Sequence, residues 1–278
     1  MEFYTNVTRY GNTLLYRGIQ NGRRSTKRIK YKPRLYVTTN RPTEWKSLTG
    51  NPLGEIEFES MRDAKEWINE KRHVAGIDIH GQIRYVSAFI NDMFPGKIQF
   101  DRNQINVTTI DIEVQSDHGF PDPKFASYPI TAITIKNNID HVYYVWALGP
   151  WDDYKSEVKL TGEESISYIR CFSEKDLLDK FLTQWQTNYP DVITGWNSTL
   201  FDWNYLINRF INVFNDGIPK KFWNGKKRQY EEYQMSKRAL KLSPWGVISK
   251  AVKDFGGESH PWYDTEGIQL LDYLPVFK

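Results

Sequence analysis

The chain has 278 residues, of which 40% are hydrophobic, with a single cysteine and a formal net charge of +3. This length predicts two domains, and the hydrophobic content suffices for packed cores. A lone cysteine, Cys171, excludes an intrachain disulfide and a cysteine-based metal site, and it favours a reducing cytosol. We also expect no membrane partner, because the start lacks an apolar signal segment and no apolar run is long enough to cross a bilayer.

Charge is distributed unevenly along the chain. Residues 1–102 contain 18 lysines and arginines against 11 acids, whereas the remainder contains 19 against 23. A basic first third followed by an acidic second part predicts different tasks for the two. We place the boundary at the polar segment "DRNQIN", which predicts a basic β-rich domain over residues 1–105 and a second domain over residues 106–278.

The first domain begins with β-type patterning. The dipeptide Asn21-Gly22 is a strong hairpin signal between the segments 13–20 and 23–32. Residues 60–72 predict a helix, with Ser60 as N-cap and Asp63 at the third helical position. Residues 81–90 and 96–101 predict two further strands.

The second domain shows strands first and then helices that alternate with strands. Strands are expected at 107–116, 128–137 and 140–148 in antiparallel order, a polar loop at 149–167, a helix after Ser173, a short strand ending at Gly195, a helix at 200–214 and a strand at 266–274. This order predicts an α/β domain with a mixed sheet, and an α+β chain overall.

Two acids stand out inside the first of these strands, "VTTIDIEVQS". Strand side chains alternate between faces, so Asp111 and Glu113 share one face and Ile110 and Ile112 the other. Carboxylates this close repel one another unless a cation lies between them or one is protonated. The pattern therefore indicates a cation site, although an edge strand with one wet face would also produce it.

A second polar group follows the short strand that ends at Gly195. In sheets of this class, sites lie at strand ends, and "TGWNSTLFD" supplies such an end. Taken alone, Asp202 in the first helical turn is most simply explained by the helix dipole. Asn197 alone is most simply a turn residue.

Together, the ordered motifs D-I-E and N-x-x-x-F-D resemble the first two motifs of the 3′→5′ proofreading exonuclease of family B DNA polymerases, which has an RNase H-like (DnaQ-like) fold. The segments "DIEVQSDHGFPDP", "TGWNSTLFDWNYL", "LLDYL" and the opening "FY…G…NGRR…YKP" resemble the replicative polymerases of T-even-like tailed phages. This resemblance spans the whole chain. It implies a protein of phage DNA replication in the cytoplasm of an infected bacterial host.

The resemblance implies roles for individual residues. Asp111 would bridge two metal ions, Glu113 would bind the ion on the nucleophile side, and Asp202 would bind the second ion. Mg²⁺ or Mn²⁺ suits an all-oxygen site. Asn197 would hydrogen-bond the primer end and Phe120 would stack on an unpaired base. An aromatic residue in "GFPDP" could equally anchor a loop, and Phe201 is more simply a core residue than a DNA contact.

The printed sequence departs from the family pattern at one point. The third motif of the family, Y-x-x-x-D, does not occur before the sequence ends at "LLDYLPVFK", and Asp272 matches a different element. We therefore expect an exonuclease region truncated before that motif, with impaired catalysis and no polymerase domain. By resemblance, the segment around Gly256-Gly257 matches a hairpin that parts primer from template, and the residues alone would equally suit a mobile basic loop.

The basic segment from Arg17 to Arg34 has eight cations and no acid, more than a solvated face needs. It favours contact with a nucleic acid backbone, single-stranded template or RNA. This segment makes a binding module without chemistry one alternative function. The acidic pair would also suit a second alternative, an unrelated RNase H-like nuclease. A sliding clamp is a partner implied for parts of the family that this sequence does not contain. The candidate backbone contacts are Arg23, Arg24, Lys27 and Arg28.

Overall fold

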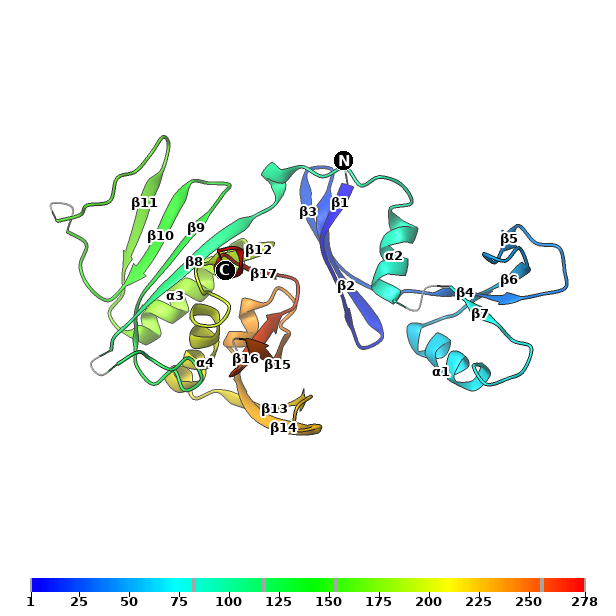
Figure 1. Ribbon diagram of the computed structural model, residues 1–278. Coiled ribbons are helices and arrows are strands. Elements are labelled where there is room, and N and C mark those ends of the chain that lie inside the picture. The colour runs from blue at the N-terminus through cyan, green and yellow to red at the C-terminus, as the bar shows by residue number, and fades with distance from the viewer. Residues whose placement is uncertain (1, 82–83, 117–118, 153–154, 256–257, 278) are drawn as a thin grey trace. The chain divides into compact units, whose positions relative to one another are not determined.

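The structure is a computed structural model that describes residues 2–81, 84–116, 119–152, 155–255 and 258–277. The chain divides into two compact units, Met1–Phe100 and Asp101–Lys278 (Figure 1). In the described part of the chain, no helix is long and apolar enough to span a membrane. Each unit has its own buried core, and each is described below by itself.

The first unit is rich in β-structure, as the sequence predicts. Strands β1 (Glu2–Tyr10), β2 (Thr13–Gln20) and β3 (Arg23–Ile29) form one antiparallel sheet. Asn21 and Gly22 have φ values of 49° and 73°, so both adopt the left-handed conformation that a type I′ hairpin turn requires. A second sheet has the order β5-β6-β4-β7, formed by β4 (Arg34–Thr38), β5 (Trp45–Lys46), β6 (Pro52–Glu57) and β7 (Ile79–His80).

Two helices complete this unit, and one of them corrects the sequence analysis. Helix α1 (Met61–Lys71) begins as predicted, with the Ser60 side chain accepting the Asp63 N–H. The prediction of a strand over 81–90 is wrong, because helix α2 (Tyr85–Met93) occupies that segment; residues 82–83 lie outside the described residues. Tyr85 and Phe89 are buried one helical turn apart, so the helical period outweighs the β-branched composition. Residues 96–101 also form no strand.

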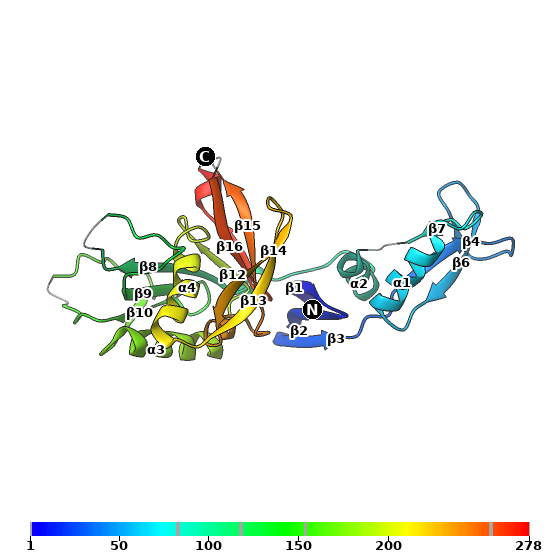
Figure 2. The same ribbon diagram turned by 90° about the horizontal axis from the view of Figure 1, so that it is seen from below.

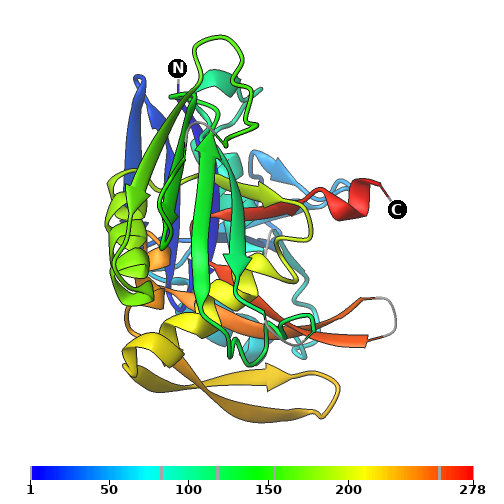
Figure 3. The same ribbon diagram turned by 90° about the vertical axis from the view of Figure 1, so that its left-hand side faces the viewer.

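The second unit is built around a mixed sheet with the strand order β11-β10-β9-β8-β12-β17 (Figure 3). The first three strands of this unit, β8, β9 and β10, are antiparallel neighbours, as predicted. Strand β12 runs parallel to β8, and β17 runs parallel to β12. The strands are β8 (Val107–Val114), β9 (Ile130–Asn137), β10 (Val142–Ala147), β11 (Ser165–Arg170), β12 (Val192–Gly195) and β17 (Gln269–Asp272).

Helices α3 (Glu174–Thr187) and α4 (Asp202–Phe214) pack on this sheet (Figures 1 and 2). Helix α3 begins as predicted, with Ser173 accepting the Asp176 N–H. The side chains of Ile110, Phe181 and Phe210 are buried in one core that joins sheet and helices. Short 3₁₀ turns lie at Arg102–Gln104, Ala239–Leu242 and Leu274–Val276.

One part of this unit differs from the predicted elements, and a second was left open by the sequence. The segment predicted as a polar loop over 149–167 ends in strand β11, which extends the sheet parallel to β10. The insertion after α4 forms two antiparallel hairpins, β13 (Gly217–Asn224) with β14 (Gln229–Ser236) and β15 (Ile248–Phe255) with β16 (Glu258–Thr265). Residues 256–257, singled out in the sequence as a hairpin, lie outside the described residues, and β15 and β16 flank them.

Candidate active site

The paired acids lie on the central strand β8, and the strand alternates as predicted. Ile110 and Ile112 are 1% and 6% exposed, whereas Asp111 and Glu113 are solvent-exposed. Both carboxylates therefore project from the face of β8 opposite the two buried isoleucines. The hydrophobic core holds this register, because a slip by one residue would bury both acids.

Strand β12 leaves part of the β8 edge open. It pairs with β8 only from Val107 to Thr109. Beyond that point, a Cβ at Gly195 would lie 2.7 Å from the Ile110 carbonyl oxygen, so only glycine allows this approach. The chain then turns into α4, and Asp202 Oδ1 accepts the Ile112 N–H at 3.0 Å. The Asp202 carboxylate thus occupies the position that a neighbouring strand would otherwise fill.

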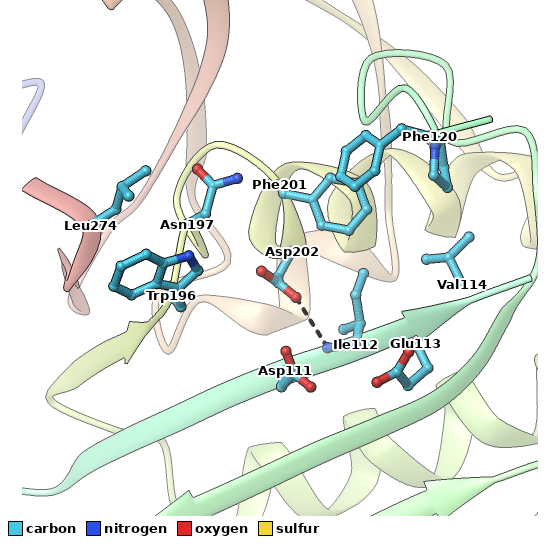
Figure 4. A pocket seen from close by; sticks show the side chains of 11 residues that line it. Asp111, Ile112, Glu113, Val114, Phe120, Trp196, Asn197, Phe201, Asp202 and Leu274 are labelled. Atoms are coloured by element: carbon cyan, nitrogen blue, oxygen red, sulfur yellow. Dashed lines mark hydrogen bonds between the residues drawn. The ribbon is translucent and has the colours of Figure 1, made fainter. Parts of the chain in front are cut away.

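These elements enclose a cavity of about 510 Å³ that contains the predicted residues. Figure 4 shows Asp111 and Glu113 on strand β8, with Asp202 and Asn197 across from them on the loop and helix that follow β12. Phe120 and Phe201 lie at one end of the cavity, and Trp196 and Leu274 lie at the other (Figure 4). The structure therefore brings together side chains that are about ninety residues apart in the sequence.

The carboxylates differ in their electrostatic environment. Burial raises the pKa of Asp202 to about 7, the Ile112 N–H opposes this shift, and the negative charges of Asp111 and Asp272 add to it. Partial desolvation also raises the pKa of Asp111 above its usual range. Either a proton or a cation would relieve the negative charge that accumulates at this site.

The two phenylalanines of the cavity are not equivalent. Phe120 is 80% exposed, whereas Phe201 is partly buried against the core. Their ring centroids are 4.9 Å apart, and Phe201 also contacts Tyr205 at 5.5 Å. Phe201 thus supports Phe120 from below, and Phe120 offers a free aromatic surface to a planar ligand.

Trp196 and Leu274 line the cavity although neither was singled out in the sequence. Trp196 is 60% exposed and stands immediately before Asn197, and Leu274 follows strand β17. A tryptophan directly after a buried strand could have pointed to Trp196 as a residue of the site. No sequence signal pointed to Leu274, because its place in the cavity depends on the pairing of β17 with β12.

The basic candidates belong to the other unit. Arg23, Arg24, Lys27 and Arg28 all lie on strand β3 and are exposed to solvent. They share no element with the cavity, so the structure provides two separate candidate regions for a nucleic acid.

The donors at the cavity suit a hard divalent cation, because carboxylate and amide oxygens are the ligands that Mg²⁺ and Mn²⁺ prefer. Within the described residues, however, no three His, Cys, Asp or Glu side chains are close enough to one another to hold one ion. The structure therefore places Asp111, Glu113 and Asp202 in one cavity, as predicted, but does not bring the three carboxylates close enough together to hold one ion. Mg²⁺ commonly binds through one or two carboxylates and completes its shell with water and substrate phosphates.

Comparison with known proteins identifies a family for most of this unit. Residues 66–240, more than half of the chain, match the family described as DNA polymerase family B, exonuclease domain. This range includes β8, the loop after β12 and α4, which carry the cavity residues. The exonuclease domain of this family is generally a metal-dependent nuclease.

Individual relatives extend the similarity over the whole chain. The chain is 30% identical over 297 aligned residues to a DNA-directed DNA polymerase of Escherichia phage RB69, covering 100% of this chain and 31% of that protein. It is 29% identical over 297 residues to the corresponding polymerase of Enterobacteria phage T4, covering 100% and 30%. A DNA polymerase of Archaeoglobus fulgidus is 26% identical over 129 residues, covering 44% of this chain and 13% of that one. The chain thus spans less than a third of the length of the phage relatives.

Proposed function

Since this chain belongs to the exonuclease domain family of the family B DNA polymerases, we propose that its second unit removes nucleotides from the 3′ end of single-stranded DNA. The observation that carries the proposal is the single cavity lined by Asp111, Glu113 and Asp202 together with Asn197 and Phe120. Proofreading of a primer end during phage DNA replication is the corresponding role. The mixed sheet with α3 and α4 packed on it supports an RNase H-like fold.

We propose Mg²⁺ or Mn²⁺ as the cofactor, held by Asp111, Glu113 and Asp202. When bound, such ions lower the pKa of a water molecule and stabilise the leaving oxygen of a phosphodiester. The Ile112 N–H fixes the Asp202 carboxylate, so this oxygen ligand is held in place before substrate arrives.

The remaining cavity residues would position the DNA. Asn197 has both a donor and an acceptor on its side chain and would hydrogen-bond the terminal nucleotide. Phe120, and Phe201 behind it, would stack on an unpaired base, which every base allows because each has a π-face. A duplex end offers no such base, so this arrangement favours single-stranded or frayed ends.

We further propose that the 278-residue chain by itself is a slow nuclease. In the described part of the chain, no three potential ligands are close enough to hold one ion, so metal occupancy depends on the phosphates of the bound DNA. The rate should therefore keep rising with Mn²⁺ concentration well beyond that of the protein.

A direct experiment is digestion of 5′-labelled single-stranded DNA by the 278-residue chain in Mg²⁺, in Mn²⁺ and in EDTA. The expected result is a ladder shortened from the 3′ end in either metal, none in EDTA, and loss of the ladder with Asp111→Ala. Glu157→Gln, an exposed acid outside the cavity, is the matched control and should digest like the wild type. Digestion that survives Asp111→Ala would contradict the proposal.

A second candidate function rests on strand β3. Its exposed Arg23, Arg24, Lys27 and Arg28 suit sequence-independent binding of single-stranded DNA or RNA without chemistry. Gel-shift binding in EDTA that persists in Asp111→Ala would support it. Polymerase activity of a longer protein, association with a sliding clamp and location in the cytoplasm of an infected bacterial host are further proposals drawn from the family.

A further inference from the structure

Asp272, the last residue of β17, holds the loop that forms one wall of the cavity. Its Oδ1 accepts the N–H of Asn197 at 2.9 Å and the N–H of Leu274 at 2.9 Å. Its Oδ2 accepts the N–H of Thr199 at 3.0 Å and the Thr199 hydroxyl at 2.8 Å. One carboxylate thus joins the loop after β12 to the turn after β17.

The loop leaves the strand through a residue with a left-handed backbone, and Asp272 holds the N–H groups on either side of this turn. Asn197 has a φ of 57°, in the left-handed region that asparagine adopts more readily than most residues other than glycine. Its carbonyl oxygen accepts the N–H groups of Leu200 and Phe201 as α4 begins. The N–H groups of Asn197 and Thr199, in contrast, are bonded by Asp272, and hydrogen bonds to an ionised acceptor are among the stronger ones.

Both segments that Asp272 joins contribute side chains to the cavity. Trp196 and Asn197 line it from the loop, and Leu274 lines it from the turn. Asp272 itself does not line the cavity, so its carboxylate acts on the site through the backbone that it fixes. It is already bonded to this backbone and is a separate group from the proposed metal ligands.

We infer that Asp272 is a positioning residue, whose carboxylate fixes Asn197 where it receives the 3′-terminal nucleotide of single-stranded DNA. The inference rests on the proposed function of the cavity. Removing the carboxylate should free the loop from its left-handed conformation and leave the Asn197 amide without a fixed direction. Recognition of the 3′ end should then fall, while general attraction to DNA persists.

The test measures binding of two probes to the 278-residue chain by fluorescence anisotropy. Both are 5′-fluorescein-labelled (dT)₁₀, one with a 3′-hydroxyl and one with a 3′-phosphate, in Ca²⁺ and before any cleavage is detected on a denaturing gel. The wild type should prefer the 3′-hydroxyl probe. Asp272→Ala should bind that probe about tenfold more weakly, as expected for losing contacts made through one polar side chain, and should no longer distinguish the two probes.

A double-mutant cycle with Asn197→Ala separates positioning from a merely structural role. If Asp272 acts through Asn197, Asp272→Ala should cause no further loss of preference in the Asn197→Ala background. Asp191→Asn is the matched control, since Asp191 bonds the Asn106 N–H beside the start of β12 and lies outside the cavity. It should retain the preference for the 3′-hydroxyl even if it lowers the melting temperature.

Hydrogen exchange provides an independent readout. The amides of Asn197 and Thr199 should exchange faster in Asp272→Ala, while those of strand β12 stay protected; Asp272→Asn serves if the alanine variant does not fold. A wild type without preference for the 3′-hydroxyl would refute the proposed function of the cavity. A preference that survives in the Asp272 variants, or an equal further loss in the Asn197→Ala background, would overturn the inference alone.

Discussion

Individual aspartates in the second unit perform different tasks because their surroundings differ. Asp111 is exposed on β8, whereas Asp202 is buried, bonded to the Ile112 N–H, and has a pKa raised to about 7. Asp202 also lies in the first turn of α4, so the helix dipole favours its charge. The simple explanation from the sequence therefore holds alongside the proposed metal-binding role, and the two do not exclude each other.

Phe120 allows a prediction at this scale. Because its ring is 80% exposed, Phe120→Ala should change the free energy of unfolding by no more than about 0.5 kcal/mol. If the ring stacks on a base, the same variant should weaken binding of single-stranded DNA by about 1–3 kcal/mol. Urea unfolding and anisotropy measure the two quantities. Phe201→Ala is the comparison and should lose stability as well, since Phe201 packs against the core; unchanged DNA affinity of Phe120→Ala would contradict the stacking role.

A second prediction concerns the ion pair of Arg209 and Glu174. The pair has two contacts of 2.7 Å, and both side chains are only 13% exposed. Arg209 also donates to the carbonyl oxygens of Ala126 and Ser127. Arg209→Ala leaves a largely buried carboxylate unpaired and should lower the free energy of unfolding in urea by about 3 kcal/mol.

The control for this prediction is a more exposed pair on α3, Lys180 with Asp176. Their side chains are 37% and 29% exposed and solvent screens the pair, so Lys180→Ala should cost clearly less stability than Arg209→Ala. Equal effects of the two substitutions would mean that burial does not set the difference between these pairs.

At the scale of elements, strand β11 shows how contacts with distant residues create structure. The sequence around Ser165 is polar, yet β11 pairs with β10 along its whole length. Glu164, just before it, forms an ion pair with Lys136 of β9 and accepts the N–H and hydroxyl of Thr161. The ion pair thus joins the start of β11 to β9, which lies on the other side of β10 in the sheet.

The Lys136–Glu164 pair predicts a pH dependence. The hydrogen bond from Lys136, followed by those from Thr161, lowers the pKa of Glu164 to about 2 from an ordinary 4.5. A carboxyl group with a lowered folded-state pKa stabilises the fold above its unfolded pKa and loses this contribution as the pH falls through its folded pKa. The stabilisation should thus be complete above about pH 4.5 and disappear towards pH 2.

Measurement of the free energy of unfolding between pH 2 and pH 5 in wild type and Glu164→Gln checks this sign. Stability of the wild type should fall more steeply towards acid than that of Glu164→Gln. Glu163→Gln changes the neighbouring exposed acid and should keep the wild-type profile. Parallel curves for wild type and Glu164→Gln would rule out the contribution of this pair.

At the scale of the whole molecule, charge separates the two units. The first has more cations than acids, including the exposed cations of β3, whereas the second has more acids than cations and carries the acidic cavity. On the proposed function, a polyanion would be attracted to the first unit by counterion release and would reach the acidic cavity only where cations screen it. Binding strength and chemistry would then fall to different units.

This division predicts a change in salt dependence. Replacing Arg23, Arg24, Lys27 and Arg28 with serine should reduce the slope of log K against log[salt] for single-stranded DNA by up to about 3, since each phosphate contact contributes about 0.7. A matched variant with serine at four other exposed cations of the unit should retain the wild-type slope. The control positions are Arg41, Lys46, Arg72 and Lys97. Equal slopes for both variants would mean that the cations of β3 are solvated and make no specific contact with DNA.

The sequence by itself determined those features that depend on neighbouring residues. Alternation in 107–114 predicted the face that Asp111 and Glu113 share, Ser60 and Ser173 predicted helix starts, and Asn21-Gly22 predicted a hairpin. Each follows from local backbone geometry, and motif order was enough to indicate the family. The strand expected at 81–90 failed because short apolar segments suit helix and strand alike, and tertiary packing chose the helix.

Only the tertiary structure decided how the cavity is assembled. Strand β12 stops pairing with β8 at Thr109, which leaves the Ile112 N–H free for Asp202, and Asp272 anchors Asn197. These contacts join segments up to about ninety residues apart. Trp196 and Leu274 entered the cavity through the same contacts. Such contacts depend on strand order in the sheet, and strand order is set by burial of the whole core, which no local pattern records.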